Sequence, residues 1–125
     1  MTDFCPCGSG QSYTQCCRRW HDGKAAPTAE ALMRSRYSAY VLRDVAYLHR
    51  SWHASTRPGK KSLLQLPATD WLGLEVLRTE QGGVEDSSGI VEFIARYREA
   101  GQEQSLHETS RFVREGGRWY YVAAV

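Results

Sequence analysis

The chain has 125 residues, which suffices for one ordinary domain and a small appendage. Its 16 basic and 14 acidic side chains give a formal charge of +2, which is too small to indicate nucleic acid as a partner. No stretch approaches the roughly 20 consecutive apolar residues that a membrane helix requires, and no apolar signal-peptide region precedes the cysteines. We therefore expect a cytoplasmic protein without a membrane span.

All four cysteines lie close together at the beginning of the sequence. They form two close pairs separated by a short loop, whereas a secreted disulfide scaffold would distribute its cysteines along the chain. Two such pairs suit the tetrahedral corners of a zinc ion. Gly8 and Gly10 permit the positive φ angles that a tight knuckle needs, and residues 11–15 suit a short helical turn that presents the second pair. We predict one structural Zn²⁺ per chain, held by Cys5, Cys7, Cys16 and Cys17.

Two alternatives to this ligand set stay open at the level of sequence. His21 follows Cys17 by four residues and is the alternative fourth ligand, because neutral imidazole binds zinc well. Disulfides between the two cysteine pairs are geometrically feasible, although a reducing compartment disfavours them. Four protein ligands close the coordination shell, so the predicted zinc is structural and not catalytic.

The Cys-Pro-Cys-Gly-Ser-Gly run, Tyr13 and the adjacent pair Cys16-Cys17 resemble the SEC-C motif. That motif is known from the C-terminal tail of the SecA preprotein translocase, where it binds zinc and contacts partners including the chaperone SecB and the ribosome. The resemblance places the zinc ligands on the four cysteines, with Cys17 at a position where SecA typically has His. It also implies that the knuckle docks a protein or the ribosome.

After a linker at residues 23–28, the sequence turns helical. Apolar residues spaced by three and four predict one amphipathic stripe from Ala29 to about Trp52, with Thr28 as the helix cap. Asp44 caps a second helix after a bend near Arg43 in one interpretation, and a single long helix is the other. Residues 51–66 are predicted to form a loop with a helical turn. The stripe consists of Met33, Tyr37, Tyr40, Val41, Val45, Leu48 and Trp52.

From Trp71 onward the pattern is that of an antiparallel sheet. Four strands are predicted at residues 71–79, 90–97, 104–114 and 118–122, separated by glycine-containing turns at 81–83, 100–102 and 116–117. Helices followed by a run of antiparallel strands indicate an α+β fold with the helices covering one face of the sheet.

Several further segments carry a resemblance that spans the whole chain: residues 32–40, 91–93, 107–112 and 118–122. Together with the cysteine segment, they resemble the YchJ-like family of uncharacterised bacterial proteins. The resemblance implies a SEC-C zinc knuckle at residues 1–23, followed at 28–125 by a cone-shaped domain similar to nuclear transport factor 2. No activity is agreed for this family.

Cone-shaped domains of this kind often enclose a cavity. Alternation in the third strand places Glu108 and Ser110 on the face of Phe112, with His107 on the opposite face. If Phe112 points into the cone, Glu108 is buried there and needs partners. We expect those partners to be Arg36 and the hydroxyls of Tyr37 and Tyr40. In one interpretation Glu108 anchors a ligand or acts as a general base. In the other, which we favour, it ties the sheet to the helix.

Two functions from different classes follow. The first is a non-enzymatic adaptor whose zinc knuckle docks a protein or the ribosome. The alternative is a cone that binds a small molecule of unknown identity, or acts on it through Glu108. The sequence contains no glycine-rich phosphate loop, nucleophile elbow or Cys-His nucleophile pair, so we favour a role without catalysis. His49 and His53 are one helical turn apart but have no third metal ligand nearby in the sequence.

Overall fold

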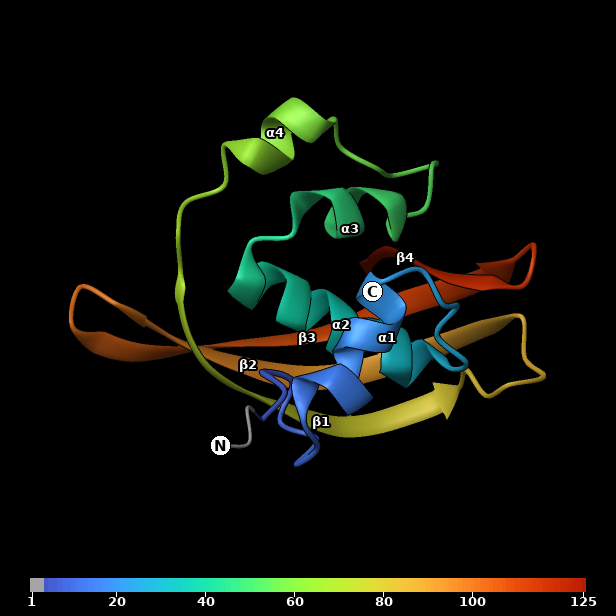
Figure 1. The fold of residues 1–125 in the computed structure, drawn as a ribbon, viewed down its shortest axis with the longest axis horizontal. Coiled ribbons are helices and arrows are strands. Elements are labelled where there is room, and N and C mark those ends of the chain that lie inside the picture. Colours follow the sequence, from blue (N-terminus) through green and yellow to red (C-terminus); the bar gives the residue numbers. More distant parts are fainter. Residues whose placement is uncertain (1–3) are drawn as a thin grey trace.

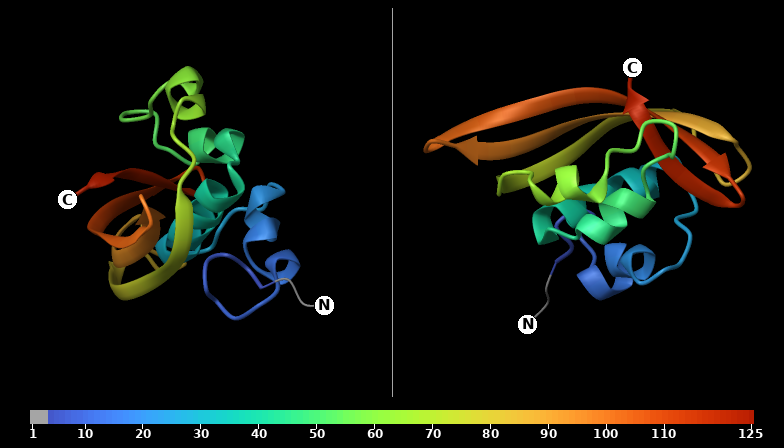
Figure 2. Two further views of the ribbon diagram at one scale, coloured as in Figure 1. Left: turned by 90° about the vertical axis from the view of Figure 1, so that its left-hand side faces the viewer. Right: turned by 90° about the horizontal axis from the view of Figure 1, so that it is seen from above.

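The computed structural model describes residues 4–125, so the first three residues of the predicted segment 1–23 lie outside the described residues. The helical part comes first and comprises η1 (Tyr13–Gln15), α1 (Cys17–His21), α2 (Ala29–Leu42), α3 (Val45–Arg50) and α4 (Lys60–Leu64). The strands follow as β1 (Asp70–Gln81), β2 (Ser88–Glu99), β3 (Gln102–Glu115) and β4 (Arg118–Ala124). The predicted α+β class is confirmed, since the helices gather on one face of a single sheet (Figures 1 and 2).

The sheet is an antiparallel meander in the order β1-β2-β3-β4. Its tight turns match the predicted positions, because Ala100 and Gly101 both have positive φ angles (52° and 78°), as the two central residues of a type I′ hairpin require. The ladder extends beyond the predicted strand ends, since backbone pairing continues where the apolar alternation has faded. Register shifts in β1 and between Arg111 and Phe112 of β3 help the sheet curl around α2.

Helix α2 begins at a side-chain cap and ends at a residue with a left-handed backbone conformation. The Thr28 side chain caps it by accepting a hydrogen bond from the backbone N–H of Ala31 at 3.0 Å. Arg43 has a left-handed conformation (φ 59°) that ends the helix, and the Asp44 side chain then caps α3 by accepting from Tyr47 N–H. The interpretation with a bend is therefore confirmed, and the single long helix is wrong. The predicted helical turn within residues 51–66 is α4.

The cysteine segment and the sheet share one hydrophobic core. The four cysteines are at most 7% exposed and belong to the same buried cluster as Met33, Phe93 and Phe112. The Arg34 guanidinium donates to the carbonyl of Cys7 at 2.9 Å, which ties the segment to α2. The division of the chain into domains at residues 1–23 and 28–125 stays a prediction. In the structure, the two parts share one hydrophobic core.

The connection between these parts is anchored as well. Ala26 is buried, and the indole N–H of Trp119 on β4 donates to the carbonyl of Pro27 at 3.3 Å. Arg118 donates to the carbonyl of Gly23 at 3.0 Å. The residues predicted as a linker are thus held against the last strand. Within residues 4–125, no helix is long and apolar enough to cross a membrane.

Candidate functional site

The four cysteine sulfurs converge beside helix α2. All four Sγ atoms lie within 4.8 Å of one another, with 3.6 Å between Cys7 and Cys16 and 4.0 Å between Cys16 and Cys17. Two sulfurs bound to a tetrahedral zinc through bonds of about 2.3 Å are about 3.8 Å apart. Four soft donors in one buried cluster are the ligand set that zinc prefers. The arrangement therefore fits a single tetrahedral ion.

Local backbone structure brings the two cysteine pairs together. A bridge between Phe4 and Ser12 closes the loop, and the N–H of Cys5 donates to the carbonyl of Gln11 at 2.8 Å. Gly8 takes a φ of 81° in this loop, which an L side chain rarely adopts. Ser12 then caps the short helix η1, after which Cys16 and the first residue of α1, Cys17, face the first pair. The expected helical turn before the second pair is present.

Hydrogen-bond partners surround the sulfurs. The hydroxyl of Ser9 lies 3.1 Å from Cys16 Sγ, and that of Ser38 on α2 lies 3.5 Å from Cys5 Sγ. Hydrogen bonds from Cys17 and Cys7 lower the pKa of Cys5, while hydrogen bonding to Cys5 raises the pKa of Cys17. The sulfurs thus compete for protons, and a divalent cation would replace those protons because it binds thiolates.

His21, the alternative fourth ligand, lies outside this cluster. Its Nδ1 is 2.7 Å from the Tyr13 hydroxyl, and its Nε2 is 2.8 Å from the backbone carbonyl of Ser35. Because the Ser35 carbonyl can only accept, Nε2 carries the proton and Nδ1 accepts from Tyr13. Neither ring nitrogen is free to bind a metal. Through these two hydrogen bonds, His21 connects Tyr13 in the cysteine segment to the backbone of α2.

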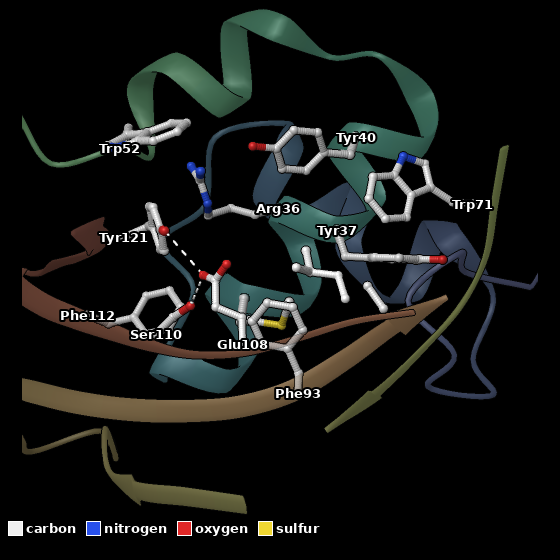
Figure 3. Close-up of a pocket in the computed structure, with 13 residues that line it drawn as sticks. Arg36, Tyr37, Tyr40, Trp52, Trp71, Phe93, Glu108, Ser110, Phe112 and Tyr121 are labelled. Atoms are coloured by element: carbon white, nitrogen blue, oxygen red, sulfur yellow. Dashed lines mark hydrogen bonds between the residues drawn. The ribbon is translucent and has the colours of Figure 1, made fainter. Parts of the chain in front are cut away.

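A cavity of about 270 Å³ lies between α2 and the concave face of the sheet (Figure 3). Its wall contains all five of the pocket residues expected from the sequence, namely Arg36, Tyr37, Tyr40, Glu108 and Ser110. Aromatic rings form most of the remaining wall, contributed by Trp52, Trp71, Phe93, Phe112 and Tyr121. Ligand pockets typically combine such an apolar wall with a few polar groups that orient the ligand.

Glu108 has partners other than the expected ones. One carboxylate oxygen, Oε2, accepts hydrogen bonds from the Ser110 hydroxyl at 2.5 Å and the Tyr121 hydroxyl at 3.3 Å (Figure 3). The expectation that Arg36, Tyr37 and Tyr40 would bind it is wrong, since none of them forms a hydrogen bond with it. Glu108 is also half-buried rather than buried. Its strand neighbours satisfy one oxygen, and the cavity leaves room beside the other.

Arg36 is directed toward the end of α3 instead. Its Nη1 donates to the backbone carbonyl of Leu48 at 3.0 Å and to the Ser51 hydroxyl at 2.7 Å. The guanidinium lies between two rings, 4.7 Å from the centroid of Trp52 and 4.6 Å from that of Tyr121. Burial lowers the pKa of Arg36, but an arginine stays charged at neutral pH. Cation–π contacts and carbonyl groups stabilise this buried charge.

Tyr121 and Trp52 were not expected in the site. Trp52 is the last member of the apolar stripe, and Tyr121 shares a strand face with the buried Trp119. The periodicity of the sequence therefore directs both side chains toward the protein interior, but it does not indicate that they line a cavity. Burial and the neighbouring Glu108 carboxylate raise the pKa of Tyr121 to about 12, so its hydroxyl remains a donor. Tyr121 on β4 pairs with Phe112, beside a register shift between Arg111 and Phe112 that the sequence alternation does not reveal.

The remaining histidines lie away from both sites. His107 is on the outer face of the sheet, as expected, where Nε2 lies 2.6 Å from a carboxylate oxygen of Glu92. His53 contacts Glu115 with its Nε2 at 3.0 Å. Within residues 4–125, the cysteine cluster is the only group of histidine, cysteine and acidic side chains placed to hold a metal ion.

These features define an α+β protein in which a SEC-C segment packs on a domain similar to nuclear transport factor 2. Residues 28–124 match the family model described as "YchJ, middle NTF2-like domain", and residues 1–19 match the SEC-C motif. The chain therefore belongs to the YchJ family, and the resemblance expected from its sequence is confirmed.

Relatives and solved structures agree with this assignment. A UPF0225 protein of Xanthomonas oryzae pv. oryzae is 54% identical over 98% of this chain and 94% of the relative. A UPF0225 protein of Chromobacterium violaceum is 51% identical over 97% and 91%, respectively. The solution structure of a SEC-C motif containing protein from Rhodopseudomonas palustris aligns with a TM-score of 0.85 and 37% identity, covering 100% of this chain and 98% of the other. A crystal structure from Psychrobacter arcticus gives a TM-score of 0.79 and 29% identity, covering 98% and 80%.

Proposed function

We propose that this protein is a zinc-stabilised binding protein whose aromatic cavity holds a small-molecule ligand. The observation that carries the proposal is the cavity of about 270 Å³, because its wall combines aromatic rings with a few polar groups, as ligand pockets do. A wall of aromatic rings favours the flat or apolar body of a ligand. The polar groups of Glu108 and Ser110 then orient it.

The proposed role of the zinc is structural. Four thiolates would complete the coordination shell of one Zn²⁺ per chain, leaving no position for water or substrate. The free, buried cysteines suit a reducing compartment, and we propose the cytoplasm. Elemental analysis of the purified protein should give one zinc per chain. Cys5→Ser and Cys16→Ser should both lose it, whereas His21→Asn should retain it. Metal-free protein with four titratable thiols would contradict this part of the proposal.

We favour binding over turnover in the cavity. Acid–base catalysis on a bound molecule typically uses a second titratable group beside the first. Apart from Glu108, the cavity wall has no acidic residue, histidine or cysteine among the described residues, and the pKa of Tyr121, the tyrosine that contacts Glu108, is raised to about 12, away from neutral pH. The two hydroxyls beside Glu108 hold its Oε2 in place. Glu108 thus resembles a ligand anchor more than a general base, and the enzyme alternative loses support.

Filling the cavity tests the binding role directly. Ala95 is a buried residue of the cavity wall, so Ala95→Phe directs an added ring into the space, and circular dichroism must show that the variant still folds. Ile94→Phe places the same aromatic side chain at the neighbouring position, on the opposite face of β2, and is the control for position. Fragment screening by NMR should give shifts at cavity residues in the wild type and in Ile94→Phe, but not in Ala95→Phe. Equal binding by all three proteins would refute a role for this cavity.

Docking of a protein or the ribosome is the second candidate function. What favours it is Phe4, whose side chain is 68% exposed directly before the first cysteine, in the segment that matches the SEC-C motif. Pull-down with the intact chain should capture a partner that Phe4→Ala releases and that a zinc chelator also releases. Leu77→Ala, which shortens an exposed apolar residue on β1, is the control. Capture that is independent of Phe4 and zinc would exclude the adaptor role.

A further inference from the structure

The cavity contains one polar acceptor that the protein leaves without a partner. Glu108 directs Oε2 to Ser110 and Tyr121, whereas its Oε1 accepts no hydrogen bond from the part of the chain that the structure describes. In Figure 3 this second oxygen points away from Ser110, into the space below α2. A carboxylate oxygen can only accept. A ligand group that meets it must therefore donate, and a positively charged donor forms the stronger bond.

The cation already near the cavity does not neutralise this oxygen by direct contact. Arg36 is oriented by its two hydrogen bonds, to the Leu48 carbonyl and the Ser51 hydroxyl. Its guanidinium stacks between Trp52 and Tyr121 and forms no hydrogen bond with Glu108, so the two charges interact only at a distance. An anionic ligand placed beside Glu108 would meet like charge. A cationic ligand there would donate to Oε1 the direct charge-assisted hydrogen bond that Arg36 does not form.

Aromatic faces surround the same space. Trp71 contacts the rings of Tyr37 and Tyr40, with centroid separations of 5.7 and 6.1 Å, and this group forms one side of the cavity (Figure 3). Phe112 and Tyr121, 5.7 Å apart, form another side close to Glu108. Ring faces carry partial negative charge and attract ammonium groups. An aromatic wall with a carboxylate at one end suits a molecule that combines an apolar body with a cationic head.

We infer that the cavity recognises an organic ammonium, a small amine with an aromatic or aliphatic body, whose charged head donates to Glu108. This inference rests on the proposed binding function and specifies the class of ligand. The volume of about 270 Å³ accommodates a body the size of one aromatic ring with a short chain. The ammonium exchanges its hydration for the carboxylate and the ring faces, which compensates its desolvation.

Three probes with one shared body test the ligand class. They are 2-phenylethylammonium, 2-phenylethanol and 3-phenylpropanoate, titrated into the full chain and followed by NMR shifts of cavity residues. We expect the ammonium to bind about tenfold or more tightly than the alcohol, and the carboxylate to bind most weakly. Equal binding of all three, or preference for the carboxylate, would overturn the inference while leaving the binding function intact. If none of them binds, both proposals fail for ligands of this size.

The variant Glu108→Gln separates the charge from the shape of the site. It should abolish the preference for the ammonium and leave the affinity for 2-phenylethanol within about twofold, because the amide keeps the volume of the carboxylate. Glu103→Gln, an equal charge change at an exposed position of β3, should keep the preference and so excludes a general effect of net charge. If Glu108→Gln does not fold, Tyr121→Phe replaces it. That variant removes one hydrogen-bond donor to Glu108, so it should retain or increase the preference for the ammonium. Loss of this preference in Tyr121→Phe would contradict the inference.

Discussion

Two buried sites lie on different sides of helix α2, and they differ in what they leave open. Toward the N-terminal segment, Ser38 approaches the sulfur of Cys5, and the sulfurs pack against one another in the core. Toward the sheet, Arg36 and Tyr40 border a cavity of about 270 Å³. In the first site all four sulfurs face one another, as the ligands of a structural metal ion do. The second keeps space and a free acceptor, as a binding site requires.

In the proposed function, the same helix serves stability on one side and recognition on the other. Small residues at Ser35 and Ser38 are fully buried and let the N-terminal segment approach the backbone of α2 closely. The large residues Arg36 and Tyr37 lie on the cavity side of the helix, where Arg36 turns toward α3. Substitutions on the two sides should consequently have different consequences, and four experiments test that difference.

Loss of the metal site is expected to have the largest effect. Cys7→Ser, or removal of zinc by a chelator, should unfold the N-terminal segment and lower the melting temperature of the whole chain, because both share one core. Zinc binding in small domains contributes about 10 kcal/mol or more, which is comparable with the stability of an entire domain. Thermal unfolding by circular dichroism measures the effect. Ser9→Ala keeps all four thiols and should cost only about 1 kcal/mol. An unchanged melting temperature in Cys7→Ser would show that the two parts are independent.

Replacement of the buried cation on the cavity side should have the next largest effect. Arg36→Met keeps an unbranched apolar side chain but leaves the Leu48 carbonyl and the Ser51 hydroxyl without their charged donor. We expect a loss of about 2 to 3 kcal/mol in the free energy of unfolding, measured by urea denaturation. The zinc content should not change. Loss of zinc in this variant would mean that the two sides of α2 are coupled.

High pH should destabilise the cavity side through Tyr121. The folded pKa of Tyr121 is raised from 10.0 to about 12, so its contribution to stability is fully present below pH 10 and is lost as the pH rises through 12. Because Tyr121 is half-buried and partly screened, we expect a loss of about 1 to 2 kcal/mol over this range. Tyr121→Phe should remove this part of the alkaline destabilisation. Tyr120→Phe is the control, and its dependence of stability on pH should match that of the wild type. If Tyr121→Phe also matched the wild type, the prediction would be contradicted.

The junction between α2 and α3 should give the smallest effect. Asp44→Ala removes the side-chain cap of α3 and should cost about 1 kcal/mol in the free energy of unfolding. Asp44→Asn retains a capping oxygen and should restore most of that loss. Neither variant should alter zinc content or the affinity for a cavity probe, because Asp44 lies outside both sites. A change in probe affinity would show that the geometry of the cavity depends on the angle between the two helices.

Much of the fold follows from local patterns, and the departures have physical causes. The glycine turns, the alternating strands and the cap at Thr28 are local features, and the structure confirms them. Whether α2 continued past Arg43 was undecided, because a capping Asp is compatible with both a helix interior and a bend. The partners of Glu108 were predicted incorrectly because the helix offered three plausible donors. The actual donors, Ser110 and Tyr121, come from its own strand and from β4.

By itself, the sequence determined the chemistry of this protein: four sulfurs in one short segment, an apolar stripe on the helix, and an acidic residue on the inner face of β3. These depend on residue type and on spacing along the chain, which are local properties. Only the tertiary structure decided that the sulfurs lie in the core of the sheet domain, that Arg36 turns toward α3, and that Glu108 keeps one oxygen free beside a cavity. Those outcomes depend on how distant elements pack, because a side chain adopts the direction that its neighbours leave available.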